Sequence, residues 1–569
     1  MLTPTELLEV VDTMQPIVDE LNDWITRDII RRLMARLERD EDFTLTGTDE
    51  WQVEVFKVAG GHYEALQQEI KRFTKKSDKE VKEIFEDIGV RAWESDMDFY
   101  ANYGFESVSL FESESMLKLL EDTYRRTNGE IHNFTRTTAE TSQQRLIKAL
   151  DTAHFKVMSG AQSYTQAVKE AVNEIANTQA TVRYPSGHID TIETAVLRAV
   201  RTGAGQASGN MTMQGLIDRD WDLIRVSAHL GARYGDGGQN PSNHFWWQGK
   251  LYSRTGRTKE YPLFEEATGY GTGEGLCGYN CRHSFGPGDP NHNPYQDFDA
   301  EENKKVYDLS QKQRRAESRI RKSKSKLIAL REAMDCSENE EVKASIQEEY
   351  NKEAAKLTKY NVKYDKFCKD NNLKKLSDRI SVAKWNRSEA AKARSVANNE
   401  YREWSKSIGI NTDPKTLAKY YDMKYNNPKE YELFKGYTNA VNKGDISPLT
   451  GYDLYKNTAN EISQKLVGVV TKDGVKIKSF ATHFVDRTLG QTSETHTDMR
   501  QGTPIEHSIE ALTNGIISEP YIRKIKRGSE YVDDLRQRYT GTHAKVTLSL
   551  TENKLIQTNP RKMKGNEYA

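Results

Sequence analysis

Residues 227–254 read SAHLGARYGDGGQNPSNHFWWQGKLYSR, and residues 270–290 read YGTGEGLCGYNCRHSFGPGDP. Glycine, proline, asparagine and aromatic residues are frequent in both stretches, whereas the sequence on either side follows helical periodicity. Such a composition excludes a regular helix and indicates turns, short strands and tightly held loops. Because loops of this length are ordered only when something links them internally, the sequence predicts a glycine-rich, irregular α+β domain with an internal link over residues 218–299.

Two interpretations of that link remain open. Cys277, Cys281 and His283, with His244 or His229 upstream, offer the sulfur and nitrogen ligands that zinc prefers. With His244 as the upstream ligand, four residues would close a structural zinc site, and the order of the loops would depend on the metal. Alternatively, the two cysteines are small buried hydrophobic residues and the histidines hydrogen-bond to loop carbonyls.

The same stretches resemble a known family. Together with YDLSQKQRRAESRIR at residues 307–321, they resemble the phage minor capsid protein 2 family, which is related to the Mu-type head-morphogenesis proteins. The resemblance extends over roughly residues 1–370. It implies a virion protein present in few copies per head, near the portal, with portal and capsid proteins as partners.

The bulk composition sets wider limits. The chain has 569 residues, 83 basic and 84 acidic side chains, 36% apolar residues and four cysteines. This length favours several domains, and the balanced charge excludes a global attraction to nucleic acid or membranes. No apolar run is long enough to span a bilayer and no secretory signal is readable, so we expect no membrane partner. The few cysteines favour reduced thiols or metal ligands in a soluble protein made in the bacterial cytoplasm.

Helical patterning dominates residues 1–217. Thr3 and Glu6 form a capping-box pattern around Pro4, and apolar residues then recur on one helical face as far as Leu21. This pattern predicts an amphipathic helix that is kinked at Pro16. The rest of the segment predicts a scaffold of packed helices.

A second helical region is expected over residues 300–464. Residues 311–331 carry nine basic side chains against one acidic side chain, and a heptad-like apolar series, with Glu353 in one position, follows as far as Phe367. The pattern predicts a basic helical hairpin or coiled-coil segment that turns near Cys336, followed by a polar linker. The cations suit packaged DNA, but a solvated helix face or a contact with another head protein suits them equally.

Residues 465–569 have the pattern of a separate small α+β domain. Residues 475–480 look like an entering strand, and residues 545–550 and 555–558 alternate as the two strands of a hairpin do. Residues 505–514 predict a short helix. The fold class is therefore multidomain and mainly α, with the glycine-rich α+β loop domain, the helical hairpin and this small C-terminal α+β domain.

The C-terminal sequence carries a second resemblance. It reads SFATHFVDRTLGQTSETHTDMRQG at residues 479–502 and KVTLSLTENKLIQTNPRK at residues 545–562. These stretches resemble the phage-associated nuclease domains of the barnase–EndoU–colicin–RelE-like superfold over roughly residues 465–565, through a His-x3-Arg pair and a strand ending in LIQTNP. The resemblance implies an RNase toxin domain that cleaves host RNA, tRNA included, without a cofactor, and for which an immunity protein exists.

The required chemistry points to particular residues. RNA cleavage without a metal needs a base, an acid and cations for the phosphate. His483 and Arg487 lie four residues apart, so on a helix an imidazole and a guanidinium share one face. His496 comes from the next loop, and Thr558 lies at the end of the final strand, where a hydroxyl can contact phosphate. We treat these four as the catalytic candidates.

The sequence offers two further candidate residues and one rival function. Arg538 and Tyr539 are candidates for binding or stacking on the RNA. A His-x3-Arg pair is also common as a plain hydrogen-bonding pair on a helix surface. The sequence therefore leaves two functions open, a virion protein with an endoribonuclease domain or a purely structural minor head protein whose C-terminal domain binds nucleic acid or a head partner without catalysis.

Overall fold

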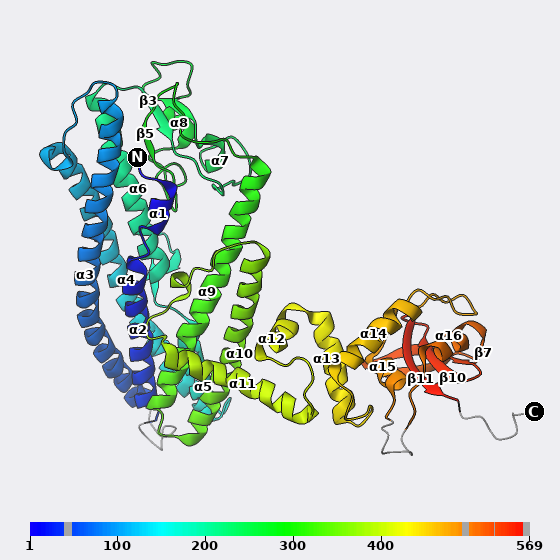
Figure 1. Ribbon diagram of the computed structural model, residues 1–569. Helices are drawn as coiled ribbons and strands as arrows, with labels where there is room; N and C mark the ends of the chain where they lie inside the picture. The colour runs from blue at the N-terminus through cyan, green and yellow to red at the C-terminus, as the bar shows by residue number, and fades with distance from the viewer. Residues whose placement is uncertain (39–47, 492–499, 528–529, 562–569) are drawn as a thin grey trace, which may run out of the picture. The chain divides into compact units, whose positions relative to one another are not determined.

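The structure is a computed structural model that describes residues 1–38, 48–491, 500–527 and 530–561. The chain divides into two compact units. Unit 1 comprises residues 1–360 and 368–393, and unit 2 comprises residues 361–367 and 394–569. Helices make up most of the ribbon (Figure 1), which confirms the prediction of a mainly α chain with more than one domain.

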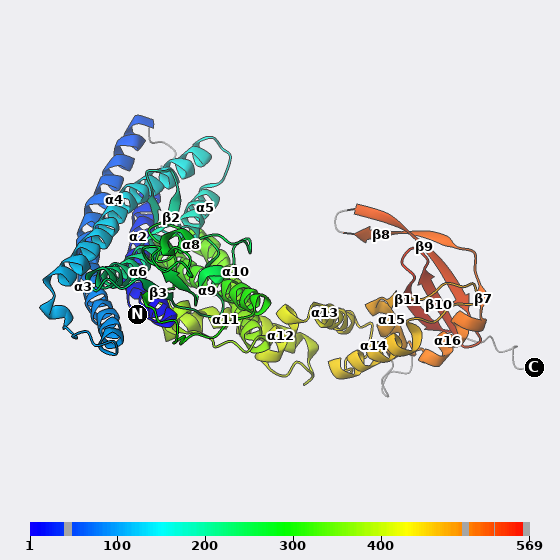
Figure 2. The ribbon, with the colours of Figure 1, turned by 90° about the horizontal axis from the view of Figure 1, so that it is seen from above.

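Long helices form the scaffold of unit 1. Helices α2, α3, α4 and α6 pack against one another, and Figures 1 and 2 show α3 and α4 running side by side. A short β-hairpin and the single-turn helix η1 connect them. The elements are α1 (Pro4–Glu9), α2 (Met14–Leu37), α3 (Thr48–Ala101), η1 (Leu110–Glu112), α4 (Glu114–Met158), α5 (Tyr164–Asn177), β1 (Thr181–Arg183), β2 (Ile189–Thr191) and α6 (Ile192–Asp218).

The first predicted helix is capped as expected but is interrupted rather than kinked. Thr3 and Glu6 form the capping box of α1. Helix α1 ends at Glu9, and α2 begins at Met14, with Pro16 in its first turn. A proline there loses no hydrogen bond, whereas in the middle of one continuous helix its ring would clash with the preceding turn. Two helices therefore replace the predicted one.

The glycine-rich domain contains a small antiparallel sheet in the order β4-β3-β5, built from β3 (Leu223–Val226), β4 (Leu251–Ser253) and β5 (Phe285–Pro287). Two short helices, α7 (His244–Trp247) and α8 (Phe264–Thr268), lie in the long loops. Trp247, Phe264 and Phe285 are fully buried in its core. This stretch therefore combines short strands and short helices with long loops.

Close backbone approach explains part of the glycine content. A Cβ on Gly275 would lie 2.2 Å from the carbonyl oxygen of Gly269, and one on Gly278 would lie 2.4 Å from that of Gly273. Both distances are shorter than any van der Waals contact, so only glycine fits at either position. The loop between α8 and β5 is therefore folded tightly on itself.

A helical hairpin follows, with α9 (Ala300–Cys336) and α10 (Glu340–Asp370) joined by the turn predicted near Cys336. The polar residue in the apolar series has a structural role. Glu353 is buried, forms an ion pair with Lys326 over 3.4 Å, and accepts a hydrogen bond from Ser323 over 2.6 Å. The short helix η2 (Asp378–Ile380) comes after the hairpin and packs on α9.

Much of the basic charge of α9 is used inside unit 1. Lys324 is buried and donates to the carbonyl oxygen of Ile380 over 2.5 Å, and Arg321 forms an ion pair with Glu193 of α6. The exposed cations lie at three- and four-residue spacing and so share one face of the helix. They are Lys312, Arg315, Arg319 and Lys322.

Unit 2 combines helices with one mainly antiparallel sheet. The sheet order is β6-β11-β10-β9-β7, β8 pairs with the outer part of β9, and β6 runs parallel to β11. Helix α15 packs on β11, and α16 packs on β10 and β9. The elements are α11 (Arg387–Ile408, in this unit from residue 394), α12 (Leu417–Asn426), α13 (Pro428–Asn442), α14 (Tyr452–Leu466), β6 (Ser479–Phe480), α15 (Thr482–Leu489), α16 (Ile505–Asn514), β7 (Ile516–Ile517), β8 (Tyr521–Arg527), β9 (Glu530–Thr540), β10 (Ala544–Ser549) and β11 (Lys554–Pro560).

The core of unit 2 extends well before residue 465. Tyr437 and Tyr455 are fully buried and belong to the same hydrophobic cluster as Phe484 and Val546. Their hydroxyls are satisfied, since Tyr437 donates to the carbonyl oxygen of Thr450 over 2.9 Å. The expected boundary at 464/465 therefore falls inside a continuous core. The tyrosine-rich stretch before it, for which the sequence predicts a polar linker, supplies core side chains.

Candidate functional sites

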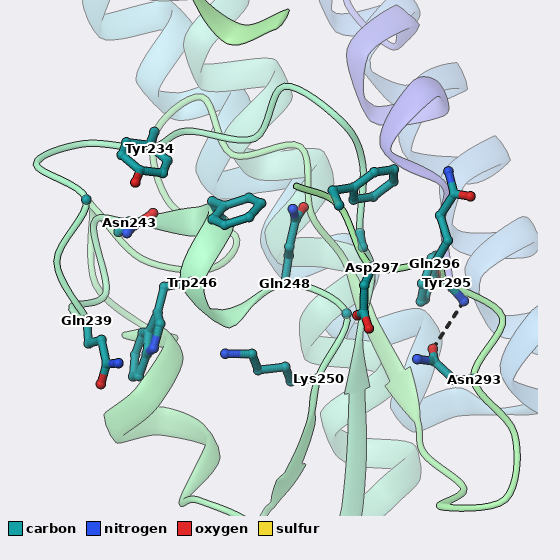
Figure 3. A pocket seen from close by; sticks show the side chains of 15 residues that line it. Tyr234, Gln239, Asn243, Trp246, Gln248, Lys250, Asn293, Tyr295, Gln296 and Asp297 are labelled. Atoms are coloured by element: carbon teal, nitrogen blue, oxygen red, sulfur yellow. Dashed lines mark hydrogen bonds between the residues drawn. The ribbon is translucent and has the colours of Figure 1, made fainter. Parts of the chain in front are cut away.

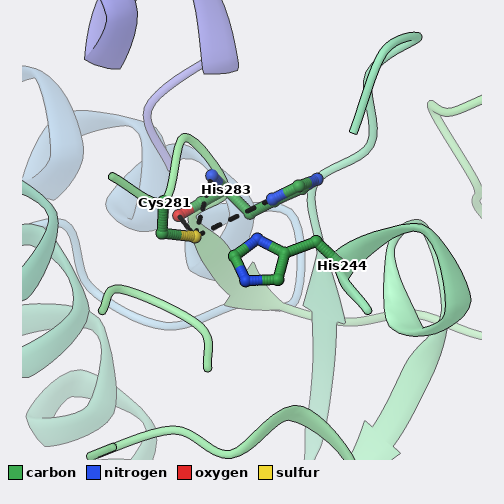
Figure 4. Close-up of side chains that lie close together, drawn as sticks. All are labelled: His244, Cys281 and His283. Atoms are coloured by element: carbon green, nitrogen blue, oxygen red, sulfur yellow. Dashed lines mark hydrogen bonds between the residues drawn. The ribbon is translucent and has the colours of Figure 1, made fainter. Parts of the chain in front are cut away.

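His244, Cys281 and His283 converge in the glycine-rich domain (Figure 4). His244 begins α7, whereas Cys281 and His283 lie on the loop that leads into β5. One ligand atom of each residue lies within 4.8 Å of those of the other two, and all three side chains are buried. The structure thus brings together three of the four residues predicted to bind zinc.

Cys277 is not among the ligand atoms that lie within 4.8 Å of one another, although its sulfur lies 3.9 Å from the main-chain oxygen of His283. A Cβ on Gly209 of α6 would meet its sulfur at 3.3 Å, and its side chain belongs to the hydrophobic cluster of Phe264 and Phe285. This position matches the alternative expectation of a small buried hydrophobic residue. His229 is nearer to the group, because its ring stacks on that of His283 with 4.6 Å between centroids.

Burial controls the protonation of this cluster. Burial lowers the pKa of His244 to about 3 and holds the pKa of His283 well below its usual value, so both imidazoles are neutral at pH 7. Burial also raises the pKa of the Cys281 thiol, although backbone hydrogen bonds and the Arg233 guanidinium act in the opposite direction. The cluster therefore consists of neutral nitrogen and sulfur groups.

A pocket of about 320 Å³ adjoins the cluster (Figure 3). Trp246, Lys250 and Asn243 are among the residues that line it, and the Lys250 ammonium lies 5.4 Å from the centroid of the Trp246 ring. Gln248 connects pocket and cluster, since its side chain lines the pocket while its Oε1 lies 3.1 Å from Nε2 of His283. The hydrogen bond between Gln248 and His283 therefore links the cluster directly to the pocket wall.

In unit 2, α15 presents His483 and Arg487 on one face, as their spacing predicts. Its other side buries Phe484 and Val485 in the core. The Nε of Arg487 donates to Nε2 of His483 over 3.2 Å. The His483 side chain is 38% exposed, so the pair can be reached from solvent.

The hydrogen bonds define the tautomer of His483. A guanidinium can only donate, so Nε2 of His483 accepts and the ring proton lies on Nδ1. Nδ1 lies 3.3 Å from Oδ2 of Asp486, whose Oδ1 accepts from the Tyr455 hydroxyl over 2.7 Å. The His483 imidazole is thus held between a carboxylate and a guanidinium, and in this arrangement its Nε2 can serve as a base.

A second carboxylate lies beside this pair. Ligand atoms of Asp445, His483 and Asp486 lie within 4.8 Å of one another. Arg500 covers the same region by donating to the main-chain oxygens of Asp445 and Asp486, over 2.9 and 3.2 Å. The His483 site is thus formed by α15 together with the segment between α13 and α14.

Two other predicted site residues point into the core. Tyr539, Val546 and Thr558 occupy one row across β9, β10 and β11, and all three are fully buried. The hydroxyl of Thr558 lies 3.0 Å from that of Ser508 on α16. These positions do not support a phosphate contact by Thr558 or base stacking by Tyr539, because both side chains face the helices rather than solvent.

Of the two remaining candidate residues, Arg538 and His496, the structure describes only Arg538. Arg538 is exposed on the opposite face of the sheet, with its guanidinium 5.1 Å from the centroid of the Tyr521 ring. It is therefore available to a substrate, but on a different element from His483. His496 lies outside the described residues.

A protein-family model described as phage minor capsid protein 2 matches residues 2–369. The chain belongs to the phage minor capsid protein 2 family. Neither a curated protein nor a solved structure matches it. Membership confirms the resemblance seen in the glycine-rich stretches and gives the chain a structural role in a phage.

The family match has a clear limit along the chain. It ends at residue 369, before α12 and the sheet of unit 2, so the nuclease resemblance of the C-terminal part stays a prediction. Within the described ranges, every helix is too short or too polar to cross a membrane.

Sequence reasoning missed several residues of these sites in this member of the family. Asp486 lies three residues after His483, a spacing that could have revealed it. Asp445 and Tyr455 come from the predicted linker stretch, and their proximity to His483 depends on the tertiary fold. The same holds for Gln248 before β4 and His283 before β5, which meet where both strands pair with β3.

Proposed function

We propose that the chain is a minor head protein located near the portal and that unit 2 is an endoribonuclease domain that cleaves host RNA without a metal. The observation that carries the enzymatic part is the hydrogen bond between Arg487 and His483, with Asp486 on the other side of the imidazole. The pair is solvent-accessible and brings together a base and a phosphate-binding cation. The order of one short strand, two helices and four further strands of a mainly antiparallel sheet, beside which β8 pairs with β9, also supports the proposed kinship with the nuclease superfold.

In the proposed reaction, Nε2 of His483 takes the proton of a ribose 2′-hydroxyl, and the resulting oxygen attacks the neighbouring phosphorus. Arg487 leaves Nε2 and binds the phosphate, where its planar guanidinium offsets the developing charge. The bond between phosphorus and the 5′-oxygen breaks, which leaves a 2′,3′-cyclic phosphate. The leaving oxygen takes a proton from an acid, for which His496 is our candidate.

The experiment uses the full-length protein with total RNA and no added divalent cation. His483→Ala is compared with wild type and with a control variant, His507→Ala, whose ring lies on α16 against His543. We expect wild type and the control to cleave RNA and His483→Ala to be at least about 100-fold slower. Undiminished cleavage by His483→Ala would refute the assignment, and cleavage only after Mg²⁺ is added would point instead to a cation at Asp445 and Asp486.

The rival function is purely structural. The burial of Thr558 and Tyr539 favours it, because two of the six proposed nuclease residues then have no part in a site. In that case unit 2 binds nucleic acid or a head partner, and none of the three proteins cleaves RNA under either condition.

The partners in the head follow from the same proposal. Portal and capsid proteins are the proposed neighbours of unit 1, and an immunity protein is the proposed partner of unit 2. Packaged DNA would meet the exposed face of α9 that carries Lys312, Arg315, Arg319 and Lys322, since clustered cations bind phosphates without sequence preference. Cross-linking of purified virions followed by mass spectrometry tests these neighbours, and absence of the chain from virions would refute the location.

A further inference from the structure

We propose that His244, Cys281 and His283 bind a zinc ion that fixes the loops of the glycine-rich domain, with Cys277 outside the ligand set. The inference concerns unit 1 and does not depend on the nuclease proposal. It rests on the convergence of three buried ligand atoms and on the hydrogen bonds that orient the two imidazoles.

The hydrogen bonds leave a free nitrogen on each imidazole. Nε2 of His244 lies 2.9 Å from the carbonyl oxygen of Glu274, which can only accept, so that nitrogen carries the ring proton. Nε2 of His283 lies 3.1 Å from Oε1 of Gln248 and donates in the same way. Each ring therefore has an unprotonated Nδ1. Metal-binding histidines normally have this arrangement, with the other ring nitrogen bonded to a carbonyl or carboxylate.

The free nitrogens lie beside a thiol. Nδ1 of His283 is 3.8 Å from the sulfur of Cys281, and Figure 4 shows the His244 ring beside the same sulfur. Zinc bonds of about 2.0–2.3 Å put neighbouring ligand atoms of a tetrahedral site about 3.5 Å apart. The distances between these ligand atoms are at most 4.8 Å. If each shortened by less than about 1.5 Å, all three atoms could therefore bond to one zinc ion.

The ligand chemistry favours zinc over the hard cations. Two neutral imidazoles and one thiolate suit a borderline metal, whereas Mg²⁺ and Ca²⁺ prefer oxygen ligands. Zinc binding would displace the thiol proton of Cys281, because only the thiolate binds the metal. The fourth position is filled by water or by His229, whose ring already stacks on His283.

The site would join segments that are distant in sequence. His244 lies on α7, and Cys281 and His283 lie some forty residues later, after the loop folded around Gly275. With few regular hydrogen-bonded strands in this region, a metal crosslink restricts the loops at both ends. The zinc would also fix His283 and through it Gln248 in the pocket wall.

The test measures zinc in full-length protein purified without chelators or added metal. We expect about one equivalent in wild type and less than a tenth of that in Cys281→Ser and His244→Gln. Two matched controls, Cys277→Ala and Cys336→Ser, should retain about one equivalent. If the His229→Gln variant retains its zinc, the fourth ligand is water. If it loses part of its zinc, the fourth ligand is His229.

A second measurement protects the test against misfolded variants. The wild-type protein is reconstituted with Co²⁺, and the thiolate-to-cobalt absorption band is recorded. We expect the intensity of one thiolate ligand. Wild type and Cys277→Ala should show the same band. Less than a tenth of an equivalent of zinc together with no such band would overturn the proposal, as would a disulfide between Cys277 and Cys281 in freshly purified protein. Loss of zinc in Cys277→Ala with its fold intact would overturn the ligand assignment.

Discussion

Arg487 donates from Nε to Nε2 of His483 across one turn of α15, over 3.2 Å. This contact makes the imidazole an acceptor and places its proton on the side of Asp486. It also means that, without substrate, the lone pair needed for base catalysis is engaged by the cation needed for phosphate binding. In the proposed reaction, substrate binding separates the two groups, so under that proposal the observed pair is the resting arrangement.

Asp486 should act as a positioning residue for His483. The residue is buried, and its carboxylate joins Nδ1 of His483 to the Tyr455 hydroxyl. In Asp486→Asn the amide can present its NH₂ group to Nδ1, which would favour the wrong tautomer. We expect a loss of about 10- to 100-fold in kcat with little change in KM, by analogy with the orienting groups of other histidine sites. The measurement is RNA cleavage by folded Asp486→Asn protein across pH 5–9.

Tyr455→Phe is the matched comparison for that variant. It removes the other hydrogen bond of the carboxylate and leaves the charge in place, so we expect a stability loss of about 1–3 kcal/mol and a smaller effect on kcat. Equal kcat values for wild type and Asp486→Asn would remove the carboxylate from the mechanism.

Thr558 should contribute to stability and not to phosphate binding. Its hydroxyl and that of Ser508 are both fully buried and lie 3.0 Å apart. Thr558→Val leaves the Ser508 hydroxyl without this partner and should destabilise the protein by about 1–3 kcal/mol. The double variant Thr558→Val/Ser508→Ala removes both hydroxyls and should recover most of that loss, as measured by urea unfolding. A large loss of cleavage by Thr558→Val at unchanged stability would restore the phosphate contact.

The orientation of Thr558 shows where the sequence stops being informative. Simple alternation from buried Leu555 would turn Gln557 inward and Thr558 outward. The register between β10 and β11 shifts between Thr547 and Leu548, and this bulge turns Thr558 inward instead. The phase of a strand after a bulge depends on pairing with its neighbour, which a single sequence does not reveal.

Features set by local chemistry were predictable. The capping box of Thr3 and Glu6, the helix ending at Asn514 and the shared face of His483 and Arg487 depend on spacings of three or four residues. The core before residue 465 was not predicted, since it consists largely of tyrosines, whose burial depends on finding partners for their hydroxyls. Strands β8 and β9 were also missed, because charged side chains mask their alternation.

Asp19 should make the stability of unit 1 depend on pH. Burial, and secondarily the nearby Glu193 carboxylate, raise the pKa of Asp19 to about 7, from 3.8. The folded protein therefore binds a proton that the unfolded chain has released between these pH values, and stability is lost as pH rises from about 4 to about 7. The difference corresponds to at most about 4 kcal/mol, at about 1.4 kcal/mol per pKa unit.

Asp19→Asn removes this titration while keeping an oxygen that can accept the hydrogen bond from Gln15. We expect the free energy of unfolding of the variant, relative to wild type, to rise between pH 4 and pH 7. Glu20→Gln, a change at an exposed neighbouring carboxylate, is the control and should show no such trend. Parallel curves for wild type and Asp19→Asn in urea titrations would contradict the prediction.

Gly275 should be among the least replaceable residues of the glycine-rich domain. A methyl group there would lie 2.2 Å from the Gly269 carbonyl oxygen and 2.6 Å from that of Thr268. Both contacts are with backbone, so the loop itself must move, and Gly275→Ala should cost more than about 2 kcal/mol. Gly60→Ala is the matched control, because Gly60 lies inside α3 and an added Cβ meets nothing within 4 Å. That change should stabilise the protein by up to about 1 kcal/mol, since alanine favours the helix.

Thermal unfolding of both variants measures the difference in stability between Gly275→Ala and Gly60→Ala. If the loop closes around the proposed zinc, Gly275→Ala should also lower the zinc content, whereas Gly60→Ala should not. Equal stability of the two variants would show that the loop can open at Gly275 without disturbing the fold, and the tight packing would then lose its structural importance.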